Sequence, residues 1–387
     1  MPIYLDYAAT TPIDPRVAQA MCECLGAAGE HGNPASLSHD FGRRARKLVE
    51  QARAQVAQLL NATPPAIVLT SGATESNNLA LFGAARFHAA RGRHIVSART
   101  EHKAVLDPLQ QLEREGFDVT LLKPEASGVV TAAQLEAALR PDTILVSLMH
   151  ANNETGAIQD IGAFGALCRA RGILLHVDAA QSAGKLPIDV QAMNIDLLSL
   201  TGHKFYGPKG VGALYVRRQP ALGLQPLLLG GGQEFGLRSG TVPTHQVVGL
   251  GLACELAAAE WADDADRIGS LRTHLWQGMA SLGEIEPNGS GDSQLCSILN
   301  VCFHGVEGES LQFALRELAV SAGAACSTGS AESSYVLRAL GRSDQEAQSS
   351  LRFSLGRFTT QADIDIAIAA IRREIPRLRA LSPRIAS

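Results

Sequence analysis

The feature that most constrains the fold is a series of seven short apolar runs between residues 66 and 217. Most of these runs are rich in Val, Ile and Leu without polar alternation, which is typical of strands covered on both faces. Segments with helical periodicity fill several of the gaps, and this alternation predicts a mostly parallel α/β sheet with right-handed crossovers. The runs cover residues 66–70, 94–98, 119–123, 143–149, 173–177, 196–200 and 212–217, and the helical segments cover 75–90, 103–115, 131–139 and 161–171.

The connection between the last two runs differs from the others. Only residues 201–211 separate the sixth run from the seventh. Because so short a connection cannot hold a crossover helix, we expect the seventh strand to lie antiparallel to its neighbour.

The pattern changes again after about residue 260. We expect a large domain over residues 16–260 and a smaller α+β domain formed by residues 1–15 and 261–387. The elements expected after the large sheet are a helix over 247–282, a strand over 296–303, a helix over 308–318, a strand over 350–355 and a closing helix over 361–381.

Composition narrows the class of protein. The chain has 387 residues, of which 46% are hydrophobic and 19% charged, as in an ordinary globular enzyme. Its net charge of -4 gives no sign of a nucleic-acid or membrane-surface partner. No apolar stretch approaches the roughly 18 residues of a membrane span, and the first residues lack the basic start and apolar core of a signal peptide. We therefore expect a cytoplasmic protein.

The cysteines predict neither disulfides nor a metal site. They are odd in number and scattered, and no Cys-x-x-Cys pair occurs among them. Most are expected to be small buried hydrophobic residues, with one exception discussed below. The seven are Cys22, Cys24, Cys168, Cys254, Cys296, Cys302 and Cys326.

A lysine and an aspartate at the ends of two apolar runs carry the first chemical signal. Lys204 follows the run 196–200 among small and hydrogen-bonding residues, and Asp178 ends the run before it. A buried lysine must lose its charge or hold a covalent partner. An amine for a Schiff base and a carboxylate for a protonated ring nitrogen are what pyridoxal 5'-phosphate (PLP) needs. The alternative is a solvated loop lysine.

A phosphate site is expected where the first strand meets the first crossover helix. In Thr70-Ser-Gly-Ala-Thr-Glu-Ser-Asn77, free N–H groups at a helix start lie beside hydroxyls, and Gly72 allows close approach of the backbone. Thr201 and His203, next to Lys204, can donate to the same phosphate. The alternative is a simple helix cap by Ser71 or Thr74.

Three further loops follow strands at the expected ligand-binding edge of the sheet. His102 is placed to stack on a pyridine ring or to move protons, although a solvated turn histidine is the alternative. The amides of His150-Ala-Asn-Asn-Glu-Thr-Gly156 suit a ring oxygen or a substrate carboxylate, against the alternative of an Asx turn. Gln181 would reach the phenolic oxygen of the cofactor.

Two residues near the C-terminus complete the set. Cys326 stands in Ser321-Ala-Gly-Ala-Ala-Cys-Ser-Thr-Gly-Ser330, which has almost no bulky side chain. Such a segment suits a mobile nucleophile better than a packed structural thiol. Arg352 lies in an otherwise apolar strand, where a guanidinium can bind a substrate carboxylate through two hydrogen bonds. The alternative for Arg352 is a structural ion pair.

These motifs, in this order, make the whole chain resemble the cysteine desulfurases, of the group that includes the housekeeping and nitrogen-fixation enzymes. The matching segments are Tyr4-Leu-Asp-Tyr-Ala-Ala-Thr-Thr-Pro12, Gly32-Asn-Pro-Ala-Ser36, Ser71-Gly-Ala-Thr-Glu-Ser-Asn-Asn78, Thr100-Glu-His102, Asn152-Asn-Glu-Thr-Gly156, His176-Val-Asp-Ala-Ala-Gln181, Gly202-His-Lys204, Arg238-Ser-Gly-Thr241, Gly323-Ala-Ala-Cys326 and Arg352-Phe-Ser-Leu-Gly-Arg357.

The resemblance implies the type I fold of PLP-dependent transferases: a large domain with a seven-stranded, mostly parallel sheet, and a smaller α+β domain that carries a mobile cysteine loop at about residues 321–333. It implies a homodimer with sites at the interface. For the cofactor ring, the resemblance implies that Lys204 forms the covalent bond to PLP, Asp178 binds the ring nitrogen, Gln181 binds the phenolic oxygen and His102 stacks on the ring. The residues implied for the phosphate are Ala73, Thr74, Thr201, His203 and the partner subunit's Thr241. Those implied for the substrate carboxylate are Arg352 and Asn153, with Asn33 a weaker candidate.

The resemblance also implies the reaction. L-cysteine displaces Lys204 from the cofactor, and the freed amine removes the Cα proton. The thiolate of Cys326 attacks the substrate sulfur and becomes a persulfide, L-alanine leaves, and His102 relays protons. The sulfur then passes to an acceptor protein, a scaffold or a carrier, for iron–sulfur cluster assembly or for modification of thio-cofactors or tRNA. A selenocysteine lyase or aminotransferase of the same fold, or an idle sulfur-carrier subunit, is the alternative.

Three segments depart from the family pattern. Gly230-Gly-Gly-Gln-Glu-Phe235 stands where relatives often carry His and Arg, so Gln233 and Phe235 are expected to alter the rim of the site or the dimer contact. Thr201 replaces a common Ser and keeps the hydroxyl. The chain ends without the longer acidic-aromatic tail that housekeeping members use to dock an iron–sulfur scaffold, so delivery to that scaffold is not assigned.

Overall fold

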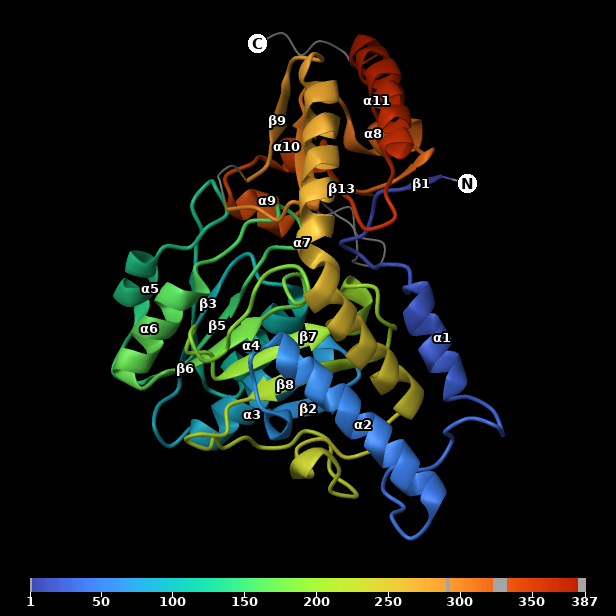
Figure 1. The fold of residues 1–387 in the computed structure, drawn as a ribbon. Coiled ribbons are helices and arrows are strands. Elements are labelled where there is room, and N and C mark those ends of the chain that lie inside the picture. Colours follow the sequence, from blue (N-terminus) through green and yellow to red (C-terminus); the bar gives the residue numbers. More distant parts are fainter. Residues whose placement is uncertain (1, 290–292, 323–332, 382–387) are drawn as a thin grey trace.

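The largest element of the structure is a seven-stranded sheet (Figure 1). The structure is a computed structural model that describes residues 2–289, 293–322 and 333–381. All seven predicted strands are present, each within about a residue of its expected bounds. In chain order they are β2 Ile67–Thr70, β3 His94–Ala98, β4 Asp118–Leu122, β5 Thr143–Met149, β6 Leu174–Asp178, β7 Leu197–Thr201 and β8 Gly212–Val216.

The order of the strands across the sheet is β2-β8-β7-β6-β5-β3-β4. The pairs β3–β4, β3–β5, β5–β6 and β6–β7 are parallel, whereas β8 is antiparallel to both β7 and β2. The prediction of an antiparallel seventh strand is therefore confirmed. Its physical reason is the short connection between β7 and β8, which reverses the chain without crossing the sheet.

Helices cover both faces of the sheet. Along β6, Leu175 and Val177 face one apolar cluster and Leu174 faces another, as alternation along a strand requires. The first cluster receives side chains from α1, α2, α5, α6 and α7, and the second from α3 and α4. These helices are α1 Pro15–Glu23, α2 Asp40–Leu59, α3 Ala73–His88, α4 Lys103–Arg114, α5 Ala132–Ala138, α6 Ile161–Arg171 and α7 Thr244–Ala280.

The C-terminal part of the chain forms a second group of elements around its own apolar cluster. Its sheet has the order β12-β13-β10-β9, and β1 pairs in parallel with β11 beside it. The helices α8, α10 and α11 lie in the same region (Figure 1). The elements are β1 Ile3–Tyr4, β9 Ile285–Pro287, β10 Ile298–Phe303, α8 Gly308–Ala314, β11 Leu318–Ala319, β12 Ser321–Ala322, α9 Tyr335–Ala339, α10 Asp344–Gln348, β13 Ser350–Ser354 and α11 Gln361–Leu381.

Helix α7 connects the two groups. Its first half packs Val247 and Leu250 into the cluster of the large sheet, and its second half packs Leu271 and Leu275 into the C-terminal cluster. Figure 1 shows this helix running from the large sheet to the second group. The expected boundary near residue 260 falls inside α7, and the division of the chain into two domains stays a prediction.

One expected helix is shorter than predicted. Helix α8 ends at Ala314 rather than near residue 318, because Leu318 belongs to β11 and pairs with Ile3. Within the described ranges, no helix has the length and apolar character needed to cross a membrane.

Candidate active site

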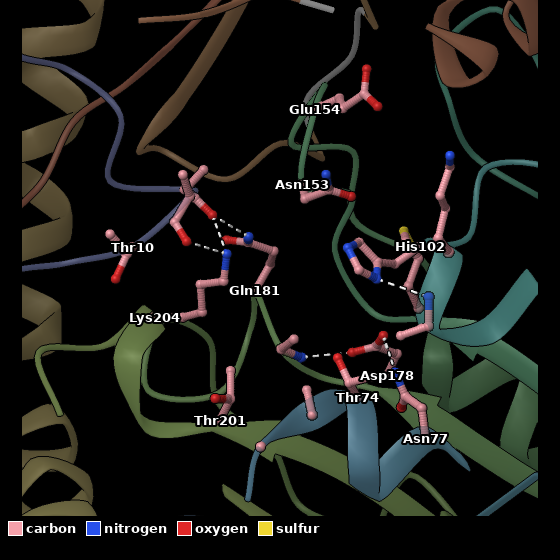
Figure 2. A pocket seen from close by; sticks show the side chains of 18 of the residues that line it. Thr10, Thr74, Asn77, His102, Asn153, Glu154, Asp178, Gln181, Thr201 and Lys204 are labelled. Carbon is pink, nitrogen blue, oxygen red and sulfur yellow. Dashed lines mark hydrogen bonds between the residues drawn. The ribbon is translucent and has the colours of Figure 1, made fainter. Parts of the chain in front are cut away.

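A cavity of about 720 Å³ lies where the carboxyl ends of β5, β6 and β7 meet the start of α3. Ligand sites in open α/β sheets are found at this edge. Figure 2 shows side chains from these elements facing one space. Of the residues predicted for the site, those that line the cavity are Ala73, Thr74, His102, Asn153, Asp178, Gln181, Thr201, His203, Lys204 and Arg352.

Lys204 enters the cavity from a short turn directly after β7. Its amine donates to the carbonyl oxygens of Ala8 and Ala9, at 2.5 and 2.7 Å. The N-terminal segment therefore runs past the site and holds the lysine at its edge. These backbone acceptors carry no side-chain signal, and the sequence did not predict them.

Asp178 ends β6 with its carboxylate turned into the cavity, and the residue is only 5% exposed. Oδ1 accepts from the backbone N–H of Ala180 at 2.9 Å, and Oδ2 accepts from the side-chain amide of Asn77 at 2.8 Å (Figure 2). Asn77 is fully buried and was not predicted as a site residue, although it lies in the motif 70–77. It orients Asp178.

The start of α3 lacks a side-chain cap. Its N-cap residue is Gly72, with φ of 151°, and no side chain bonds the first turn. The alternative of a cap by Ser71 or Thr74 is therefore wrong. Gly212 of β8 passes so close that a Cβ there would lie 2.7 Å from the Cα of Gly72. The uncapped N–H groups of this turn remain available to an anion.

Thr201 at the end of β7 and His203 in the turn after it also line the cavity. Thr201 is buried, and its hydroxyl donates to the carbonyl of Val211 at 3.4 Å. His203 pairs with the hydroxyl of Thr10 through Nδ1 at 3.1 Å. Burial lowers the pKa of His203 to about 4, and the cations of Lys204 and Lys209 act in the same direction. His203 is therefore neutral near pH 7.

His102 is the N-cap of α4. Its Nδ1 accepts from the backbone N–H of Ala104 at 3.0 Å (Figure 2). Although the ring faces the cavity, the surrounding protein excludes water and so lowers its pKa, with Asp178 opposing this shift and Lys204 adding to it. A neutral ring whose Nδ1 accepts a bond carries its proton on Nε2.

Arg352 lines the cavity and links three segments of the chain. Its guanidinium donates to the carboxylate of Asp6 at 2.7 Å, to the carbonyl of Asn153 at 2.8 Å and to the hydroxyl of Ser321 at 2.9 Å. The alternative of a structural ion pair is thus present in the structure. The buried Nε of Arg352 has no hydrogen-bond partner within the described residues. This N–H can therefore still donate to a ligand.

Two acidic side chains nearby hold their protons unusually tightly. Glu154 lines the cavity and accepts from the hydroxyl of Ser334 at 2.6 Å, and desolvation raises its pKa to about 7. Glu101 is fully buried, accepts from the backbone N–H of Met149, and has its pKa raised well above the ordinary value by burial. The sequence assigned neither residue a role.

The remaining predicted site residues lie elsewhere. Thr241 and Asn33 are exposed and do not line the cavity of this chain. Cys326 lies outside the described residues. Among the other cysteines, Cys24, Cys168, Cys254 and Cys302 are buried as expected, whereas Cys22 is exposed and Cys296 is half-buried.

The segment 230–235, which differs from the family pattern, contains one partner of a buried ion pair. Glu234 accepts from the guanidinium of Arg53 at 2.6 and 2.8 Å, and from the backbone N–H of Leu69 at 2.7 Å. Phe235 is 54% exposed, and its ring lies 5.5 Å from the guanidinium carbon of Arg53 and 5.0 Å from that of Arg218. The segment is therefore fixed to β2, beside the start of α3.

Comparison with known proteins gives one consistent family. The family model described as aminotransferase class-V matches residues 3–366. Proteins named cysteine desulfurase IscS from Shewanella baltica and Pectobacterium atrosepticum are 58% and 57% identical over 383 residues, which is 99% of this chain and 95% of each relative.

Solved structures agree with this result. A NifS-like protein superposes with a TM-score of 0.91 at 36% identity, covering 98% of this chain and 100% of the other. A structure described as SspA in complex with cysteine has a TM-score of 0.81 at 40% identity and covers 92% and 99% of the two chains.

Proposed function

The chain belongs to the class-V aminotransferase family and, within it, to the cysteine desulfurases, and on this premise we propose that its cavity removes sulfur from L-cysteine with PLP as cofactor. The products are L-alanine and a persulfide on Cys326. The observation that carries the proposal is the convergence of Lys204, Asp178 and the uncapped start of α3 on one cavity.

The residues around the cavity fit PLP. Asp178 is a buried carboxylate that, in the part of the chain described, forms no ion pair with a Lys, Arg or His. A buried carboxylate is stable when a cation or several donors face it, and a protonated pyridine nitrogen is such a cation. The first turn of α3 has N–H groups without a capping side chain, as a bound phosphate requires.

The chemistry divides between cofactor and protein. When bound, PLP supplies an aldehyde that reacts with amines and a ring that withdraws electrons from Cα. Lys204 holds the cofactor and, once released, accepts the Cα proton on Nζ. Asn77 and the N–H of Ala180 hold the Asp178 carboxylate in place toward the ring nitrogen. His102 presents Nε2–H to the cavity as a proton donor.

Substrate binding and sulfur transfer require further residues. Arg352, steadied by Asp6 and by the carbonyl of Asn153, binds the substrate carboxylate together with the Asn153 amide. Cys326 attacks the substrate sulfur as a thiolate. The carbon–sulfur bond of the substrate breaks, a sulfur–sulfur bond to Cys326 forms, and Cβ of the substrate gains a proton, so that the atoms balance.

The test is a single-turnover measurement of L-alanine from L-cysteine with the cofactor-loaded protein. We expect Lys204→Ala to abolish alanine formation, and we expect Cys326→Ser to lose the persulfide and slow alanine release. The matched control is Lys123→Ala, which changes an exposed lysine outside the cavity. Alanine formation at the wild-type rate in Lys204→Ala would refute the proposal.

Two further parts of the proposal concern partners. Thr241 is exposed outside the cavity of its own chain, which supports a role toward the phosphate of a second copy in a homodimer. Sedimentation of the loaded protein tests this: a monomer with full activity contradicts it. A sulfur-acceptor protein would then take the persulfide sulfur. A cytoplasmic location stays a prediction.

A further inference from the structure

A second lysine, Lys185, lies directly behind the wall of the cavity. It belongs to the turn that follows β6 and is only 6% exposed. Gly184, with φ of 70°, precedes it, and a Cβ there would lie 3.0 Å from both Phe205 and Ala257. The chain can make this close turn only with glycine, and the turn directs the long side chain of Lys185 inward.

The amine of Lys185 contacts a residue of the site. Its Nζ donates to Oε1 of Gln181 at 3.3 Å. The amide nitrogen of Gln181 donates to the carbonyl of Ala8 at 2.8 Å, and the same carbonyl accepts from Lys204. A glutamine amide has two N–H donors. With its oxygen bound to Lys185 and one N–H bound to Ala8, Gln181 keeps one N–H for the cavity that it lines (Figure 2).

The charges around Lys185 do not explain its burial. The groups that act on it are Lys204, Arg352 and Cys296, and within the described ranges no carboxylate forms an ion pair with it. His203, which Lys185 influences in turn, is neutral. Burial lowers the pKa of Lys185 to about 7, and Lys204 and Arg352 act in the same direction. A buried lysine kept only for stability would be expected to have an acidic partner.

From this arrangement we infer that Lys185 is a positioning residue: it binds the oxygen of the Gln181 amide and so keeps the amide nitrogen facing the cavity, where it donates to the phenolic oxygen of bound PLP. The inference rests on the proposed function. Without Lys185, only the bond to the carbonyl of Ala8 opposes a turn of the amide that would bring its oxygen toward the cavity, where it would face another oxygen and repel it.

The consequence can be measured on the chromophore. A hydrogen bond donated to the ring oxygen favours its deprotonated form. Losing an ordinary hydrogen bond corresponds to a shift of about 1 pKa unit in the visible-absorption transition of the loaded protein. We expect Lys185→Met to shift this transition upward by about that amount, and Lys185→Gln, which restores an uncharged donor, to return it toward wild type.

The experiment is a pH titration of the visible spectrum for wild type, Lys185→Met and Lys185→Gln, with Lys123→Met as a control at an exposed lysine. Lys185→Leu takes the place of Lys185→Met if the methionine variant does not fold. Combining Lys185→Met with Gln181→Leu tests whether Lys185 acts through Gln181. In that background Lys185→Met should add no shift, and a shift as large as in the wild-type background would overturn the inference.

Two other outcomes are also decisive. An unchanged transition in Lys185→Met, or equal shifts in the methionine and glutamine variants, would overturn the positioning role. The visible band itself must appear on loading with PLP and be lost in Lys204→Ala. If the band is absent, both the proposed function and this inference are wrong. If the band is normal and Lys185→Met does not change its transition, only this inference is wrong.

Discussion

Replacing Glu234 by glutamine should destabilise the fold far more than the loss of one surface charge. The carboxylate of Glu234 accepts two hydrogen bonds from the Arg53 guanidinium and one from the backbone of Leu69. Both side chains are almost completely removed from water, with 4% and 3% of the arginine and glutamate side chains exposed. Glu234→Gln keeps the size of the side chain but leaves the buried Arg53 charge with only the partly exposed Glu50 carboxylate, at 3.2 Å, as counter-charge.

The expected magnitude follows from that geometry. Breaking a buried, hydrogen-bonded ion pair from one side destabilises a protein by about 3–5 kcal/mol. The free energy of unfolding of a whole domain is about 5–15 kcal/mol, so Glu234→Gln should remove a large part of it. Replacing both partners, as in Arg53→Met with Glu234→Met, should be less harmful than Glu234→Gln alone because neither buried charge remains and Glu50 is partly exposed to water.

The assay is equilibrium urea unfolding of the cofactor-free protein, followed by far-ultraviolet circular dichroism. The matched control is Glu136→Gln, which breaks the exposed pair with Arg171 and should change the free energy of unfolding by less than about 1 kcal/mol. A loss for Glu234→Gln as small as that of the control would refute the reasoning, and so would a double variant less stable than the single one.

Three further predictions concern the site and the response to pH. Asn77→Ala should weaken cofactor binding about tenfold or more, seen as faster loss of cofactor absorbance on dilution, because Asp178 loses a buried donor; unchanged retention would contradict this. Hydrogen bonds from Arg16 lower the pKa of Asp14 from 3.8 to about 2, so its stabilisation is present above pH 3.8 and is lost as the pH falls toward 2. Asp14→Asn should flatten this part of the acid-unfolding curve, and a curve that keeps its slope would disprove it. Desolvation raises the pKa of Glu154 from 4.5 to about 7, so its contribution is present below pH 4.5 and declines as the pH rises to about 7. Thermal melts across that range should lose this decline in Glu154→Gln.

The large sheet was predictable because β2, β3, β5, β6, β7 and β8 are buried along their whole length, whereas the edge strand β4 is partly exposed. That burial demands an apolar run, and the runs gave all seven strands and the antiparallel β8. The pairing of β1 with β11 was not predictable, since strands of two residues are too short to show a side-chain pattern. The same pairing takes Leu318 away from the end of α8 and so shortens the expected helix.

The site was predictable where side chains carry the chemistry. Lys204, Asp178 and His102 stand directly after apolar runs, and the sheet brings those strand ends together. The carbonyls of Ala8 and Ala9 were not predictable, because every residue has a carbonyl. Lys185 carried a usable signal, since it follows small residues in Ala183-Gly-Lys185 and has no acidic residue within three positions in the sequence.

Arg352 shows where two sequence interpretations were not exclusive. A substrate-binding arginine and a structural ion pair were weighed against each other. The structure has the ion pair with Asp6 at the lining of the cavity, so the pair fixes the same guanidinium that is proposed to bind substrate. Sequence alone could not show this, because Asp6 lies far from Arg352 along the chain.

The path of the N-terminal segment has a consequence for biosynthesis. Ala8 and Ala9 leave the ribosome long before Lys204, and at about 5–20 residues per second the delay is roughly 10–40 s. The delay between the synthesis of Ile3 and that of Leu318, its partner in the β1–β11 pair, is longer still. A nascent chain therefore cannot finish the lysine's surroundings during translation of its first half, and the pocket matures only when nearly the entire polypeptide has been made.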